Sequence, residues 1–107
     1  MATDALKRLS GPALLTGSAA TVYTVPASTT TTLRNIHVCN ETGTAATLTM
    51  SIGTDGAGKR LFMGFSVSAN DVLDWSGAIV MTAAEVIQAF SGTASALTLT
   101  VSGVETA

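Results

Sequence analysis

The sequence predicts an all-β fold, an antiparallel β-sandwich that is jelly-roll-like and has about eight short strands. Apolar and polar residues alternate with a period of two after Pro12, as they do in strands with one buried face. Turn-forming residues interrupt the alternation roughly every 8–12 residues, which is typical of sandwiches and barrels. No segment has the periodicity of a crossover helix, so a parallel α/β fold is excluded.

The first residues are expected to form a short N-terminal arm, residues 1–12, ahead of a single β-sandwich domain of residues 13–107. Residues 3–9 could form one or two helical turns, which Gly11 and Pro12 would end. A frayed arm is the alternative, because so short a helix is marginal without a partner surface.

The first half of the domain contains three predicted strands, at residues 21–25, 33–40 and 47–52. The first is rich in β-branched residues and stops at Pro26. The second follows a Thr-rich segment, and the third alternates apolar and hydroxyl side chains. Strict alternation in the second strand predicts Arg34, Ile36, Val38 and Asn40 on one face and Leu33, Asn35, His37 and Cys39 on the other.

A glycine-rich loop, residues 53–58, introduces the second half. The strands expected there are residues 60–67, 72–75, 78–81, 86–90 and 97–101. Ser76 and Gly77 are expected to form a turn between two of them, and residues 91–96 a loop of turn formers.

The scarcity of charge is the most informative feature of the composition. Charged residues make up 11% of the chain and the net charge is −2, against roughly 25% charged residues in an ordinary soluble domain. This balance provides no basic surface for nucleic acid or an anionic membrane, so neither is expected as a partner. Because monomers usually rely on interspersed charges for solubility, the composition favours a subunit of an assembly.

Two features indicate a protein made in a cytoplasm and not secreted by its own signal. Cys39 is the only cysteine, so no disulfide can form within the chain. The apolar stretch that follows Lys7 and Arg8, residues 13–15, is too short for the core of a signal peptide.

Residues 53–59 match the phosphate-loop pattern G-x-x-x-x-G-K, but Arg60 stands where that motif needs Ser or Thr. The following residues alternate like a strand, whereas phosphate binding needs the N-terminus of a helix. A hairpin loop is therefore expected. Asp55, Asp71 and Asp74 lack the spacing of a calcium loop and are expected as turn and cap carboxylates.

No catalytic, cofactor-binding or metal-binding residue is assigned, and the protein is not expected to be an enzyme. His37 could be combined with Ser51 and Asp74, but the sequence has no nucleophile elbow. His37 and Cys39 supply too few ligands for a structural zinc within one chain, and a site shared across an oligomer axis stays open. Trp75 is either a core or interface anchor or a carbohydrate-stacking platform.

Several segments resemble short β-rich virion proteins of tailed bacteriophages. They are residues 22–26, the Thr-rich lead to residues 33–40, residues 73–77 and the closing residues 97–105. The resemblance implies a non-enzymatic structural protein of the virion, assembled in the bacterial host cytoplasm, that decorates and stabilises the particle. Capsid decoration (cement) and tail-associated roles both stay open.

The implied partners are copies of the chain, with a trimer favoured because closed symmetry covers exposed strand edges, and the major capsid protein or tail proteins. The N-terminal arm or residues 29–32 are expected to make these contacts. The alternative function is a receptor- or glycan-binding module at the tail tip or fibre, with Trp75 and the loop of residues 53–58 as its contact surface.

Overall fold

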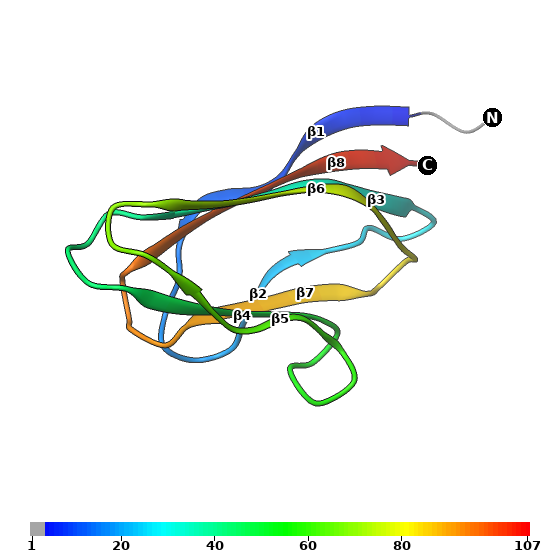
Figure 1. Cartoon of the computed structure of the whole chain (residues 1–107). Helices are drawn as coiled ribbons and strands as arrows, with labels where there is room; N and C mark the ends of the chain where they lie inside the picture. Colours follow the sequence, from blue (N-terminus) through cyan, green and yellow to red (C-terminus); the bar gives the residue numbers. More distant parts are fainter. Residues whose placement is uncertain (1–3) are drawn as a thin grey trace.

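The computed structural model describes residues 4–107, and its eight strands form two four-stranded antiparallel sheets (Figure 1). This confirms the predicted all-β sandwich. The strands are β1 (Asp4–Leu14), β2 (Ala20–Thr24), β3 (Thr30–Asn40), β4 (Ala46–Ile52), β5 (Arg60–Val67), β6 (Val72–Met81), β7 (Val86–Ser91) and β8 (Leu97–Thr106). No helix long and apolar enough to cross a membrane occurs in residues 4–107.

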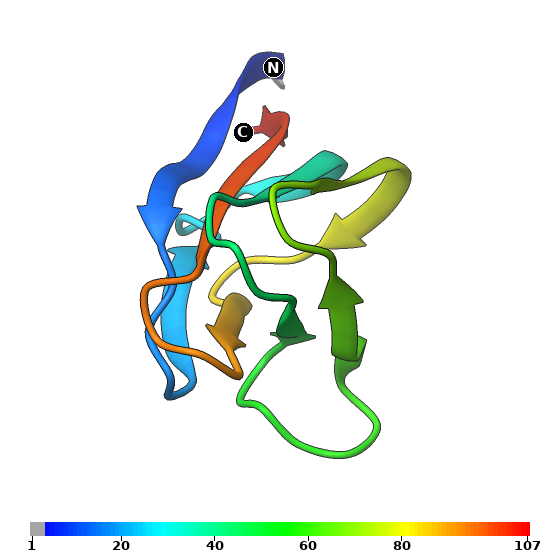
Figure 2. The same cartoon turned by 60° about the vertical axis from the view of Figure 1, so that its left-hand side comes forward.

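The strand order is that of a jelly roll. Sheet A has the order β1-β8-β3-β6 and sheet B the order β2-β7-β4-β5. The chain can be followed as one long hairpin in which β4 pairs with β5, β3 with β6, β2 with β7, and β1 with β8. Rolling this hairpin adds the β3–β8 and β4–β7 pairings, which close the two sheets. Figure 2 shows the sheets facing each other.

The N-terminal segment is a strand, so the helical turns expected over residues 3–9 are wrong for residues 4–9; Thr3 lies outside the described residues. The register runs without interruption from Asp4 opposite Thr106 to Arg8 opposite Ser102. Hydrogen bonding to β8 provides the partner that an isolated short helix lacks. The division into an arm of residues 1–12 and a domain of residues 13–107 stays a prediction.

Strand β6 is continuous, whereas the sequence predicted two strands separated by a turn at Ser76 and Gly77. Ser76 pairs with Asn35, and Ile79 pairs with Leu33. The two residues between them, Gly77 and Ala78, therefore lie opposite a single residue of β3, so the predicted turn is a β-bulge.

The expected faces of β3 are wrong at one point, because β3 itself is irregular at Arg34. Leu33 pairs with Gly103 of β8, and Asn35 pairs with the adjacent Ser102, so Arg34 is an extra residue. The bulge reverses the alternation there, since side chains before and after it are out of phase. Leu33 is consequently buried in the core and Arg34 is exposed.

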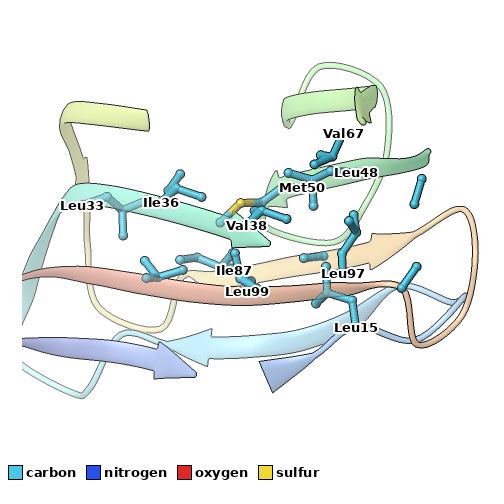
Figure 3. Close-up of a cluster of buried hydrophobic side chains, with 14 of the residues drawn as sticks. Leu15, Leu33, Ile36, Val38, Leu48, Met50, Val67, Ile87, Leu97 and Leu99 are labelled. Atoms are coloured by element: carbon cyan, nitrogen blue, oxygen red, sulfur yellow. The ribbon is translucent and has the colours of Figure 1, made fainter. Parts of the chain in front are cut away.

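The core lies between the sheets and is apolar (Figure 3). Burying each large aliphatic side chain contributes roughly 1.5–3 kcal/mol relative to leaving it in water. The fully buried residues include Leu33, Ile36 and Val38 of β3, Leu48 and Met50 of β4, Ile87 of β7, and Leu97, Leu99 and Val101 of β8.

Asn40, at the end of β3, is one of several fully buried polar side chains, and its amide is fully hydrogen-bonded. Its Nδ2 donates to the carbonyl oxygens of Thr44 and Val67, each at 3.0 Å. Its Oδ1 accepts from the backbone N–H of Thr42 at 2.9 Å and from the Thr42 hydroxyl at 2.7 Å. Asn40 thus holds the following turn against the end of β5 without leaving a buried polar atom unpaired.

We expect Gly103→Ala to destabilise the fold by about 1–3 kcal/mol. A Cβ at Gly103 would collide with the backbone carbonyl oxygen of Thr32 and would lie 3.0 Å from a methyl group of Leu9. Backbone cannot yield as a flexible side chain can, so β3 and β8 would have to separate. Denaturant unfolding measures the difference.

Gly43→Ala is the matched control, because a Cβ there has no neighbour within 4 Å. Its free energy of unfolding should stay within about 0.5 kcal/mol of the original chain. If the two variants had the same free energy of unfolding, the β3–β8 pairing would tolerate a Cβ at position 103, and the prediction would be wrong.

Candidate interaction surface

Around Asp55, the outer face of sheet B carries polar groups that are hydrogen-bonded within the chain. Asp55, in the glycine-rich loop, accepts from the Ser51 hydroxyl at 2.9 Å and from Arg60 Nε at 3.1 Å. The backbone N–H of Asp55 donates to Gln88 Oε1 at 3.0 Å. Hydrogen bonds from Arg60 and then Ser51 lower the pKa of Asp55, so it stays a carboxylate.

The glycine-rich loop is a hairpin loop, as predicted. Gly53–Gly58 connects β4 to β5, and a strand follows it instead of a helix. Arg60, which replaces the Ser or Thr of a phosphate loop, is paired with Asp55. The loop therefore has neither the helix N-terminus nor the hydroxyl that a phosphate loop uses.

The structure does not assemble the hypothetical triad. His37 Nδ1 lies 3.7 Å from Asp74 Oδ1 on the outer face of sheet A. Ser51 belongs to β4 of sheet B and donates to Asp55 instead. Residues 4–107 contain no group of three or more His, Cys, Asp or Glu side chains placed to hold a metal ion.

Trp75 occupies the inner side of β6, where it is partly buried and packs against the core. Of the two expected roles, this packing is that of a core anchor. The loop that was expected to share a contact surface with it leaves sheet B, whereas Trp75 belongs to sheet A.

The outer face of sheet A carries several exposed apolar side chains. Paired residues on the four strands form a row near the two chain ends, here called the upper row. It consists of Leu6, Val104, Thr32 and Val80. Leu6 is 80% exposed and Val80 is 65% exposed. A lower row, near the other end of the strands, consists of Leu14, Thr98, Cys39 and Val72.

A wide hollow of about 920 Å³ adjoins the upper row. The small residues Ser76, Gly77 and Ala78 of β6 leave this space open beside Arg34, the bulged residue of β3. Arg34 is exposed there, and among residues 4–107 no carboxylate pairs with it. The hollow is lined by Leu6, Arg34, Ser76, Gly77, Ala78 and Val104.

A polar cluster on the inner side of sheet A holds β1 in place. Lys7 Nζ lies 3.0 Å from Glu105 Oε1. The Tyr23 hydroxyl of β2 donates to Glu105 Oε2 and lies 2.8 Å from Thr31 Oγ1. Because Lys7 points inward, its neighbour Leu6 points outward to the hollow.

This cluster shifts two pKa values in opposite directions. Burial, and then the hydrogen bond to Glu105, raises the pKa of Tyr23 from 10.0 to about 12. Hydrogen bonds from Tyr23 and then Lys7 lower the pKa of Glu105. The neutral phenol and the charged carboxylate are therefore the forms that the fold favours.

Sequence reasoning missed the hollow and the Tyr23–Glu105 pair. The signal for the hollow was the run of small residues Ser76, Gly77 and Ala78, which was interpreted as a turn. No pattern in the sequence pointed to the contact of Tyr23 with Glu105, since the two residues are 82 positions apart.

No protein-family model matches the chain, and no curated protein matches its sequence. A solved structure of infectious bursal disease virus, Gx strain, is similar over 98% of this chain, with a TM-score of 0.56 and 10% identity. The match covers 32% of that viral chain, so this chain spans about a third of its length. At this identity the similarity concerns the fold alone.

Two further structures are similar over nearly the whole chain with lower TM-scores. A structure of Bacillus endospore appendages, described as disulfide-linked pili, has a TM-score of 0.49 and 14% identity over 99% of this chain and 85% of that chain. A pentameric capsid protein from metagenomic phage sequences has a TM-score of 0.34 and 18% identity over 97% and 59%.

We expect the phenol of Tyr23 to titrate near pH 12 in the folded protein, about two units above its ordinary value. Tyr23 is the only tyrosine, so the ultraviolet absorbance of phenolate reports it alone. Glu105→Gln removes the charged acceptor and should move the titration back toward pH 10.0. A folded protein that titrates at the ordinary value would refute the buried contact.

The same shifts set the pH dependence of stability. The pKa of Tyr23 is higher in the folded chain, so its contribution is complete below pH 10.0 and is lost as the pH rises through about 12. The pKa of Glu105 is lower in the folded chain, so its contribution is present above pH 4.5 and is lost as the pH falls through the folded value. In Tyr23→Phe, the melting temperature should not show the loss between pH 10.0 and about 12 that Tyr23 causes in the original chain.

Proposed function

We propose that the chain is a non-enzymatic structural protein of a bacteriophage virion, an oligomeric accessory subunit that decorates and stabilises the particle. The observation that carries this proposal is the outer face of sheet A, which bears four exposed large aliphatic side chains: Leu6, Leu14, Val72 and Val80. These side chains form two exposed apolar rows on one sheet face, and exposed apolar groups gathered in this way are typical of an interaction site.

The low charge of the chain supports the same proposal. With 11% charged residues, the protein has few of the groups that keep a free monomer soluble. The polar groups around Asp55 on sheet B are hydrogen-bonded within the chain, whereas the apolar rows of sheet A have no cover among residues 4–107. Contacts with other protein in an assembly would remove these rows from water.

The proposed partners are copies of the chain, as a trimer or another closed ring, and the major capsid protein or tail proteins of the same virion. The proposed location is the capsid surface as a decoration protein, or the tail. Receptor binding at the tail tip is not favoured by any observation, because Trp75 packs against the core.

The N-terminal segment contributes to this surface as a strand. Deleting residues 1–11 would unpair most of the β8 edge and remove the contact of Lys7 with Glu105. The deletion would therefore disturb the domain as well as docking. A point substitution at Leu6, which is exposed, separates the two effects.

We expect purified virions of the phage that encodes the chain to contain it, with a copy number that quantitative mass spectrometry can compare with the major capsid protein. A ratio near one indicates decoration of the whole shell. A ratio of a few per cent or less indicates the tail or neck. Absence of the chain from intact virions would contradict the proposal.

A further inference from the structure

Strand β6 leaves one edge of sheet A open. It is the last strand of that sheet and pairs with β3 (Figure 2). Among residues 4–107, the backbone of β6 makes no hydrogen bond to the backbone of any strand other than β3. An open edge of this kind is a template for pairing with a strand of another chain.

The other three sheet edges are protected in ways that β6 is not. Strand β1 contains Pro12, three charged residues and two register shifts. Strand β2 has only five residues, and β5 has two register shifts and the left-handed Gly64. Strand β6 has ten residues, no proline and one charged residue, Asp74. Because charge, proline, short length and irregular pairing keep strand edges apart, β6 is the edge best suited to a partner.

The bulge in β6 does not close this edge. It contains Gly77 and Ala78, whose small size lets a second backbone approach. Exposure alternates along the strand on both sides of the bulge, since Leu73, Trp75 and Ile79 are half-buried and their neighbours are exposed. The even-numbered residues therefore share the outer face of sheet A: Val72, Asp74, Ser76, Ala78 and Val80.

In a symmetric antiparallel pair of two β6 strands, one register matches this pattern. With Ser76 on the two-fold axis, Val72 of each copy lies opposite Val80 of the other, and these side chains are 49% and 65% exposed. The upper row of one copy then continues into the lower row of the other. Moving the axis by one residue to either side would set Val80 opposite a polar residue, Asn70 or Asp74.

The same register brings opposite charges together. Arg34 lies beside Ala78 and has no carboxylate partner among residues 4–107. Across the pairing, Ala78 faces Asp74 of the second copy, two strand spacings or about 10 Å from Arg34, which a long side chain can span over an alanine. Within residues 4–107, Asp74 makes its contacts through Oδ1, with Asn35 Nδ2 at 2.8 Å and His37 Nδ1 at 3.7 Å, so Oδ2 is available.

We infer that β6 pairs with β6 of a second copy of this chain about a two-fold axis at Ser76, with Arg34 of each copy bound to Asp74 of the other. The two sheets A then form one sheet of eight strands. The inference rests on the proposed function as an oligomeric subunit and names the surface of that oligomer. The contact is isologous and closes at two copies, so a ring of three would need another surface.

A cysteine on the axis tests the register. In a Cys39→Ser background, the exposed Ser76→Cys should form a disulfide-linked dimer on mild oxidation. Opposed residues of an antiparallel pair have Cα atoms about 4.5–5.5 Å apart, within the range of a disulfide. A mixture of Val72→Cys and Val80→Cys chains should link as well, because these two positions face each other.

Ala78→Cys is the matched control, since it is exposed on the same strand two residues from the axis. Its two copies would lie about 14 Å apart and should stay unlinked. Failure of Ser76→Cys to link would overturn the inference. Equally efficient self-linking of Ala78→Cys would indicate a different register and would overturn it too.

Sedimentation measures the ion pair without cysteines. Arg34→Asp and Asp74→Arg should each raise the dissociation constant of the dimer about tenfold, because each reversal places like charges together at two symmetric positions. The double variant restores opposite charges and should associate within about threefold of the original chain. A double variant as weak as the single ones would show that the two side chains do not meet.

The inference and the proposed function can fail separately. A chain that is present in virions but monomeric at all concentrations would refute the inference and leave the proposed function standing. A dimer linked through Ser76→Cys, from a chain that intact virions lack, would support the inference and refute the proposed function.

Discussion

The pairing of β3 with both β6 and β8 is the constraint on which the rest of the structure depends. The extra residue in β3 turns Leu33 into the core and Arg34 out of it. The neighbouring strands accommodate this bulge with their smallest residues. Gly103 on β8 lies too close to the Thr32 carbonyl for any side chain, and Gly77 and Ala78 on β6 lie opposite the bulge. One irregularity thus explains the buried core position, the obligatory glycine and the open hollow.

Polar groups on both sheets are paired within the chain. On sheet B, Asp55 gathers the polar groups of its loop, and their hydrogen bonds are made within the chain. On sheet A, the inward groups are paired through Glu105, while the outward groups are aliphatic and exposed. The contact of Lys7 with Glu105 therefore helps to hold the strand that carries Leu6 against β8.

The sequence was sufficient to predict the sandwich and most of its strands, because alternation with a period of two is a local property. It predicted β5 with its observed bounds and β2, β3, β4 and β7 within three residues at each end, whereas β8 extends five residues further than predicted. The prediction from sequence failed where a strand that is distant in the sequence determines the local backbone structure. The segment before Pro12 extends because β8 is beside it, and Gly77 continues β6 because Arg34 bulges opposite. The hollow depends on both events, so no local pattern could reveal it.

The nested hairpin has a consequence for the order in which the sheets form and open. The tip, β4 with β5, joins residues that are close in sequence, whereas the pairing of Asp4 with Thr106 closes a loop of almost the whole chain. Loop closure costs more entropy as the loop lengthens. We expect β4 and β5 to pair first during folding and the two chain ends to pair last. In the folded protein, the amide hydrogens of the chain ends should exchange with solvent fastest. The chain ends include Leu6 and Val104, which line the hollow, so this side of the hollow would open most easily. A neighbouring subunit bound there would stabilise the pairing of β1 with β8.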